Sequence, residues 1–150
     1  MKFNNIDFKV SVIIPTYNRG NLIINSIKSV LNQTFRNLEV IVVDDGSTDN
    51  TEDEINKITD KRIKYIKLNS NRGGSNARNV GIKNATGQFI SFQDSDDIFY
   101  PNKIEKQIKN IINIIYFNLI ILIKIRINKN SIFDFCKINV IYNSTYSYHI

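Results

Sequence analysis

Short apolar runs alternate with amphipathic segments along the first hundred residues of the chain. Four apolar runs have the length of buried strands, at 10–14, 39–43, 63–68 and 89–92. After the first run, apolar residues recur at helical spacing: Ile23, Ile27, Val30 and Leu31. Strands that alternate with helices indicate parallel βαβ units. The pattern therefore predicts an α/β fold, with helices on both faces of a mostly parallel sheet.

Polar residues between these segments predict where the helices begin and end. Asn21 can cap the first helix, which should end near Gln33. Thr51-x-x-Glu54 offers a capping box for a short second helix. Gly87 is expected to end a third helix, before the strand at 89–92.

The character of the sequence changes near residue 110. Of the forty residues 111–150, nineteen are Ile or Asn, and none is Gly or Pro. We therefore predict a domain at 1–109 and an Ile/Asn-rich tail at 110–150, whose fold the pattern does not define. The apolar run at 111–123 is shorter than the about 18–20 residues of a membrane-spanning helix, so we expect a buried or interfacial segment.

Composition restricts the chemistry that the chain can perform. The formal net charge of +6 could favour nucleic acid, anionic lipid or phosphorylated small molecules, but no run of five basic residues occurs. The single Cys136 excludes an internal disulfide, and the single His149 leaves zinc sites and His-based triads without ligands. Residues 1–9 lack an apolar segment of signal-peptide length, which predicts a cytoplasmic protein. Catalysis or binding must depend on Asp, Arg and the backbone.

An acidic cluster follows the fourth predicted strand, with Asp94, Asp96 and Asp97 within four residues. Open α/β sheets bind ligands at the carboxyl ends of their strands. Carboxylates this close repel one another unless a cation joins them, and oxygen ligands favour Mg²⁺ or Mn²⁺. The cluster therefore predicts a metal site, and an acidic turn that caps the next helix is the alternative.

Two further motifs lie between predicted strands and helices. Gly73-Gly74 and Arg78 lie at a predicted helix start, where backbone N–H groups favour an anion such as a diphosphate. The alternative for Arg78 is an ion pair with a carboxylate such as Asp94 or Asp97. Asp45, directly after the second strand, can face a ligand, and the alternative is an Asp-Gly turn. Both can hold, since Asp44 or Asp49 can make the local hydrogen bonds of the turn while Asp45 faces the ligand.

Five motifs in order resemble the family 2 glycosyltransferases of the GT-A fold. The resemblance covers about residues 9–109 and rests on Val12-Ile13-Ile14-Pro15-Thr16-Tyr17-Asn18-Arg19, Gln33-Thr34-Phe35, Val42-Val43-Asp44-Asp45-Gly46-Ser47-Thr48-Asp49, Gly73-Gly74-Ser75-x-Ala77-Arg78-Asn79-x-Gly81 and Asp94-Ser95-Asp96-Asp97. No Gly-x-Gly-x-x-Gly follows the first strand and no Gly-Lys-Ser/Thr occurs, which argues against dinucleotide oxidoreductases and P-loop NTPases.

The resemblance implies a role for each matching residue. Nucleotide contacts are expected from Pro15, Thr16, Tyr17, Arg19, Asp45 and Arg78. Contacts to the donor sugar and diphosphate are expected from Gly73, Gly74, Asp94 and Asp97. A divalent metal, Mn²⁺ or Mg²⁺, is expected on Asp94 and Asp96.

The implied activity is inverting transfer from a nucleotide-sugar, with UDP-sugar as the expected donor, to a glycan, lipid or protein acceptor. Such enzymes serve polysaccharide biosynthesis, and association with the inner membrane face is possible for them. The chain departs from the family in its second half, where an acidic base is expected, because only Glu105 and Asp134 follow Asp97 as carboxylates. We therefore hypothesise a truncated domain, incomplete on its C-terminal side. The alternative function is a non-catalytic donor-binding fragment, and a basic surface-binding module is a weaker one.

Overall fold

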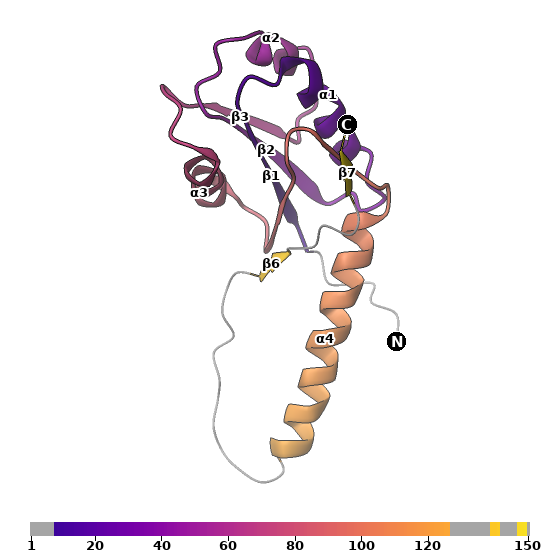
Figure 1. Cartoon of the computed structure of the whole chain (residues 1–150). Helices are drawn as coiled ribbons and strands as arrows, with labels where there is room; N and C mark the ends of the chain where they lie inside the picture. The colour runs from indigo at the N-terminus through magenta and orange to yellow at the C-terminus, as the bar shows by residue number, and fades with distance from the viewer. Residues whose placement is uncertain (1–7, 127–138, 142–146, 150) are drawn as a thin grey trace.

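A five-stranded parallel sheet forms the centre of the molecule (Figure 1). The computed structural model describes residues 8–126, 139–141 and 147–149. The sheet has the order β3-β2-β1-β4-β6, from the strands β1 (Val10–Thr16), β2 (Leu38–Asp44), β3 (Ile63–Lys67), β4 (Phe89–Phe92) and β6 (Asn139–Ile141). A separate antiparallel pair joins β5 (Asp97–Phe99) to β7 (Ser147–His149).

Helices cover both faces of the sheet. They are α1 (Gly20–Leu31), α2 (Thr51–Asn56), α3 (Gly74–Asn84) and α4 (Lys103–Arg126). Alternate residues of β1 point to opposite faces: Ile13 packs in a cluster with Ala77 of α3, whereas Val12 and Ile14 pack with α1 and the start of α4. In Figure 1, α3 lies apart from α1 and α2. This arrangement confirms the predicted α/β class.

Neither predicted side-chain cap forms, so both capping predictions were wrong. Asn21 lies inside α1, and the N–H of Gly20 donates to the Asp49 carboxylate, 3.1 Å away on the loop before α2. No side-chain cap forms on α2 either, where the backbone N–H of Thr51 donates to the same carboxylate, two residues before it, at 3.0 Å. Asp49 therefore supports the first turns of two helices.

Gly87 was predicted to end α3, but it does not. It is needed instead for packing. The helix ends three residues earlier, at Asn84. A Cβ added at Gly87 would lie 2.7 Å from the carbonyl oxygen of Lys9 and 2.8 Å from the Ser11 nitrogen. Glycine therefore permits the close approach of this connection to β1.

The last long helix, α4, crosses the predicted boundary at residue 110. Its first turns pack against the sheet through the buried Ile104 and Ile108, while Ile114 is 60% exposed. Figure 1 shows α4 extending well past the sheet. No helix within the described ranges is long and apolar enough to span a membrane. The division into a domain and a tail stays a prediction.

Candidate functional site

A pocket of about 410 Å³ lies at the carboxyl ends of β1, β2 and β4 and at the N-terminus of α3. Its lining residues are Pro15, Thr16, Tyr17, Arg19, Asp45, Asn71, Gly73, Gly74, Ala77, Arg78, Asp94, Ser95 and Asp96. Every predicted site residue except Asp97 is among them. Sequence reasoning missed Asn71, Ala77 and Ser95, although Ala77 and Ser95 lie within the motifs that carried the resemblance.

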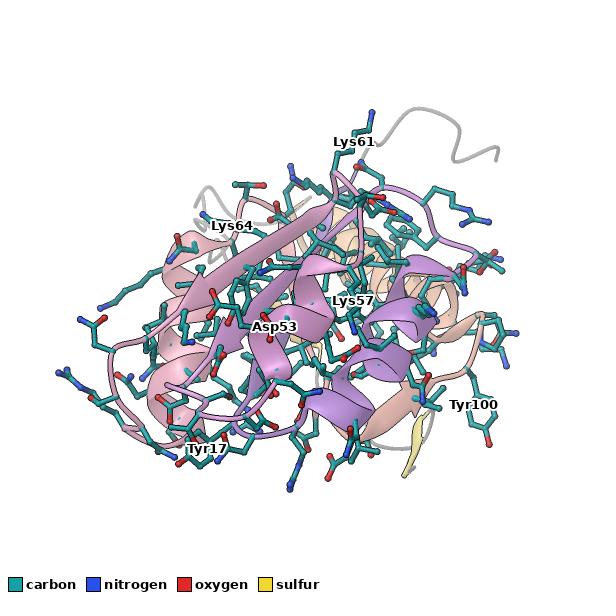
Figure 2. The ribbon with its side chains drawn as sticks, turned by 90° about the horizontal axis from the view of Figure 1, so that it is seen from above. Tyr17, Asp53, Lys57, Lys61, Lys64 and Tyr100 are labelled. Carbon is teal, nitrogen blue, oxygen red and sulfur yellow. The ribbon has the colours of Figure 1, made fainter. Side chains whose placement is uncertain are left out.

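The first part of the pocket is the chain that leaves β1. Thr16 is 3% exposed, and within the described residues its Oγ1 is buried without a hydrogen-bond partner. Tyr17 follows and is 41% exposed. Figure 2 shows Tyr17 at one end of the sheet and Lys61, which precedes β3, at the other. A buried hydroxyl and an exposed aromatic ring beside each other suit a ligand with both polar edges and a flat face.

Asn18 fixes this loop from behind the pocket. Its backbone has a φ of 51°, a left-handed conformation that Asn tolerates better than most residues. Its Oδ1 accepts a hydrogen bond from the Thr48 backbone N–H at 2.9 Å, and its own N–H donates to Ser47 Oγ at 2.9 Å. The side chain thereby ties the loop after β1 to the turn after β2, and sequence analysis gave it no such role.

Asp45 connects the turn after β2 to the loop that precedes α3. Its side chain is almost fully buried and accepts hydrogen bonds from the backbone N–H of Arg72 at 3.0 Å and of Gly73 at 2.7 Å. The following Gly46 has a φ of 80°, and a Cβ there would lie 2.9 Å from the carbonyl carbon of Ser70. The turn therefore supports the loop that leads into α3, in addition to lining the pocket.

The neighbouring aspartates make the local hydrogen bonds, as one of the predicted alternatives had it. Asp44 Oδ1 accepts from the Ser47 N–H at 2.8 Å, and its Oδ2 accepts from the Tyr65 hydroxyl at 2.7 Å. Burial and this hydrogen bond to Asp44 raise the pKa of Tyr65, so the phenol stays a donor. Asp45 is consequently the one of these two carboxylates that lines the pocket.

The N-terminus of α3 opens toward the pocket. Gly73 has a φ of 90°, and α3 has no side-chain cap. The N–H groups of Asn76 and Ala77 donate to the Gly73 carbonyl, which leaves the earlier amides and the helix dipole directed at the Gly73-Gly74 edge of the pocket. An anion would be stabilised at this position.

Arg78 forms an ion pair with Asp94 across the pocket, which is the alternative interpretation given above. Arg78 Nη2 lies 2.7 Å from Asp94 Oδ1, and the two side chains are 33% and 55% exposed. Arg78 extends over Gly74, where a Cβ would lie 3.1 Å from Nη1. A cationic and an anionic group thus face each other within one pocket.

Asp94 and Asp96 are the two carboxylates at the end of β4 that line the pocket with their neighbour Ser95. Over the described ranges, no group of three Asp, Glu, His or Cys residues is arranged to hold a metal. Two carboxylates at an open pocket nevertheless fit a hard cation that takes its other ligands from water and phosphate oxygens. The donor chemistry of the pair therefore suits Mg²⁺ or Mn²⁺.

Asp97 is not among the residues that line the pocket, and its role beside the donor sugar stays a prediction. It begins β5, where it pairs with His149 of β7, and its backbone carbonyl accepts from the buried Gln93 side chain at 2.9 Å. Burial lowers the pKa of Lys103 to about 8, and the charge of Asp97 partly offsets that shift. The charge of Asp97 is thus close enough to Lys103, at the start of α4, to affect that side chain.

The expected acidic base is not found in the described part of the second half. Glu105 accepts from the Thr34 hydroxyl at 2.7 Å, pairs with Lys109 on α4, and does not line the pocket. Asp134 falls outside the described residues. Glu105 is therefore excluded as the base in this arrangement.

A parallel sheet with a polar pocket at its strand ends and a helix N-terminus beside it defines an α/β ligand-binding domain of the GT-A type. The family model described as Glycosyl transferase family 2 matches residues 11–130. The chain belongs to this family, which confirms the resemblance.

Relatives in the family carry more specific names. The chain is 45% identical over 130 residues to the UDP-Glc:alpha-D-GlcNAc-diphosphoundecaprenol beta-1,3-glucosyltransferase WfgD of Escherichia coli, covering 84% of this chain and 49% of WfgD. It is 56% identical over 108 residues to an uncharacterized glycosyltransferase of Rickettsia conorii, covering 69% of this chain and 17% of that protein. The chain thus spans about half or less of these relatives.

Solved structures share the fold and include ligand complexes. Residues 1–349 of S. aureus TarS in complex with UDP match with a TM-score of 0.62 and 40% identity, covering 65% of this chain and 30% of that one. The mannosyltransferase PcManGT from Pyrobaculum calidifontis, in complex with GDP-Man and Mn²⁺, matches with a TM-score of 0.59 and 30% identity, covering 63% and 29%.

Proposed function

We propose that the pocket binds the nucleoside diphosphate of a sugar donor, and that the chain is the donor-binding part of a glycosyltransferase. One observation carries the proposal. The open N-terminus of α3, with Arg78, faces Asp94 and Asp96 in the same pocket, so a group for the diphosphate lies opposite a pair suited to a cation. The TarS complexes with UDP and UDP-GlcNAc, and PcManGT with GDP-Man and Mn²⁺, support this assignment.

The nucleoside is assigned to the loop after β1. The unpartnered Oγ1 of Thr16 can satisfy a polar edge of the base or ribose, and the exposed Tyr17 ring can stack on the base. Pro15 and Arg19 line the same end of the pocket. Because the TarS complexes contain UDP and UDP-GlcNAc, we propose a UDP-sugar as the donor.

The diphosphate is assigned to the Gly73-Gly74 turn and Arg78. Asp94 and Asp96 would hold Mn²⁺ or Mg²⁺, which when bound neutralises charge on the leaving diphosphate. The guanidinium of Arg78 would stabilise the same developing charge from the other side. This chain's residues therefore bind and orient the donor and prepare its leaving group.

Inverting transfer is a further proposal, since it requires a base beyond the residues that line the pocket. The name of WfgD suggests a lipid-linked acceptor, which would bring the protein to the inner membrane face. A cytoplasmic location stays a prediction. The engagement of Glu105 with Thr34 and Lys109 favours the second candidate, a donor-binding unit without transfer activity.

Calorimetric titration with UDP tests the proposal. We expect binding with Mn²⁺ present, loss of that binding when Mn²⁺ is chelated, and at least about tenfold weaker binding in Asp96→Ala. Folded wild-type protein that fails to bind UDP would refute it. Product formation from a UDP-sugar and a lipid-linked acceptor then separates the enzyme from the non-catalytic unit.

A further inference from the structure

The ion pair between Arg78 and Asp94 joins two groups that the proposed function assigns to different parts of the ligand. Arg78 is assigned to the diphosphate and Asp94 to the metal, yet the two side chains bind each other at 2.7 Å. We propose that this ion pair is the resting state of the site and that it couples the two binding events: each ligand releases the residue that the other needs. The inference rests on the proposed function.

The backbone on both sides of the ion pair is fixed, so that the change involves side chains. The Asp94 carbonyl accepts hydrogen bonds from Ser26 Oγ of α1 and from the Asp97 N–H, both at 3.1 Å. Arg78 belongs to α3, and its guanidinium lies over Gly74, which has no side chain to obstruct it. Rotation about side-chain bonds is then enough to separate the pair.

The ion pair is weak enough to break and strong enough to measure. Both side chains are partly exposed, at 33% and 55%, and pairs of this kind change an equilibrium by about fivefold or less. While Arg78 occupies Oδ1 of Asp94, a positive charge adjoins the carboxylate, and this charge opposes the binding of a cation there. Asp94 therefore becomes a full metal ligand only after it releases Arg78.

The released guanidinium remains in the same pocket as the α3 N-terminus, where it can bind a diphosphate. Conversely, Arg78 held by a diphosphate leaves Asp94 free for a cation. Linkage requires the two effects to be equal, so the factor by which Mn²⁺ raises the UDP affinity equals the factor by which UDP raises the Mn²⁺ affinity. The ion pair increases that factor, because it penalises either ligand alone more than both together.

The test replaces Arg78 and compares the result with a matched loss of charge. Arg78→Met removes the ion pair, whereas Lys83→Met removes a positive charge from an exposed side chain in the last turn of the same helix, which is not part of the pocket lining. Free Mn²⁺ is titrated by electron paramagnetic resonance without nucleotide, and UDP is titrated by calorimetry at saturating Mn²⁺. Thermal unfolding of each variant confirms that it is folded.

The two readouts of Arg78→Met should move in opposite directions. We expect Mn²⁺ alone to bind about two- to fivefold more tightly, and UDP at saturating Mn²⁺ to bind about ten- to a hundredfold more weakly. Lys83→Met should change either constant by less than about twofold, since the Lys83 charge is exposed and screened and is not paired with Asp94. Arg78→Lys, which keeps the charge, should lie between wild type and Arg78→Met.

Two results would overturn the coupling and leave the proposed function intact: Mn²⁺ affinity unchanged in Arg78→Met, or equal tightening of Mn²⁺ binding in Arg78→Met and Lys83→Met. Both results are compatible with wild-type protein that still binds UDP in the presence of Mn²⁺. If wild-type protein binds no UDP at all, the proposed function fails and the coupling fails with it. The two failures are thus distinguishable.

Discussion

Replacing Asp45 separates direct contact with the nucleotide from an effect through the loop before α3. The Asp45 carboxylate is almost fully buried and binds the amides of Arg72 and Gly73, at 3.0 and 2.7 Å. Hydrogen bonds to a charged group contribute about 1.5–3 kcal/mol each. Because both amides lie on one short loop, their contributions overlap, and about 3 kcal/mol is a reasonable total for the loop.

Asp45→Ala should therefore increase the ratio of open to closed loop by about two orders of magnitude, since ~1.4 kcal/mol corresponds to a factor of ten. A donor that needs the loop closed must then supply the missing free energy. We expect the UDP affinity to fall by up to about a hundredfold. In Asp45→Asn one carbonyl oxygen remains for the Gly73 amide, so a loss of about tenfold is expected.

Amide hydrogen exchange, measured by NMR, reports on the loop without any ligand. Exchange at Arg72 and Gly73 should accelerate in both Asp45 variants, in the same order as the loss of UDP affinity. Asp53→Asn is the matched control, because Asp53 is an exposed residue of α2 (Figure 2) that does not line the pocket. If UDP binding is lost while both amides exchange as in wild type, Asp45 acts by direct contact and the reasoning from the loop is wrong.

Three further predictions concern packing, pH and the loop after β1. Gly81→Ala places a Cβ 2.4 Å from Cγ2 of the buried Ile13. The cost of overpacking, about 1–3 kcal/mol, should exceed the ~1 kcal/mol by which Ala stabilises a helix relative to Gly. Urea unfolding should therefore show a net loss of stability. Burial alone would raise the pKa of Glu39, but hydrogen bonds from Ser11, Lys9 and Thr86 outweigh it and lower the pKa from 4.5 to about 2. The stabilisation by ionised Glu39 is therefore complete above about pH 5 and is lost as the pH falls toward 2. Between pH 7 and pH 3, the free energy of unfolding should fall by about 2 kcal/mol more in wild type than in Glu39→Gln. Equal losses in the two proteins would contradict this. Asn18→Gly can keep the left-handed backbone but loses the side-chain acceptor, whereas Asn18→Ala disfavours that backbone as well. Calorimetry should therefore find UDP binding about three- to tenfold weaker in Asn18→Ala than in Asn18→Gly. The reverse order would exclude backbone strain as the cause.

The central strands were predictable because the sheet buries them on both faces. All seven residues of β1 are buried, and the sequence there is apolar except for the small Ser11, with Pro15 and Thr16 at the end. The convergence of Thr16, Asp45 and Arg78 followed from topology alone, because parallel strands bring their carboxyl ends to one edge. Fold class and the location of the pocket were therefore accessible from sequence.

Helix starts and the roles of single side chains depended on contacts that the local pattern does not show. Asn21 and Thr51 have the residue types of caps, but Asp49 accepts from the first N–H of both helices, from Gly20 across 29 residues and from Thr51 two residues away. Asp97 belongs to the same acidic cluster as Asp94, yet it begins the short strand β5 and is not among the residues that line the pocket. Local sequence shows which groups can bind, and only the tertiary structure shows which of them already have a partner.

The carboxylates of the pocket illustrate why this distinction matters for function. Asp45 is buried and engaged with backbone amides, which makes the edge of the pocket near α3 rigid before any ligand binds. The Asp94 side chain is 55% exposed and forms an ion pair with Arg78, a side chain that can move. The diphosphate end of the site is thus preorganised by hydrogen bonds to the backbone, whereas the metal end is held by an ion pair that ligands can exchange. Changes in Mn²⁺ concentration should therefore act on donor binding mainly through Arg78 and Asp94, with the loop before α3 unchanged.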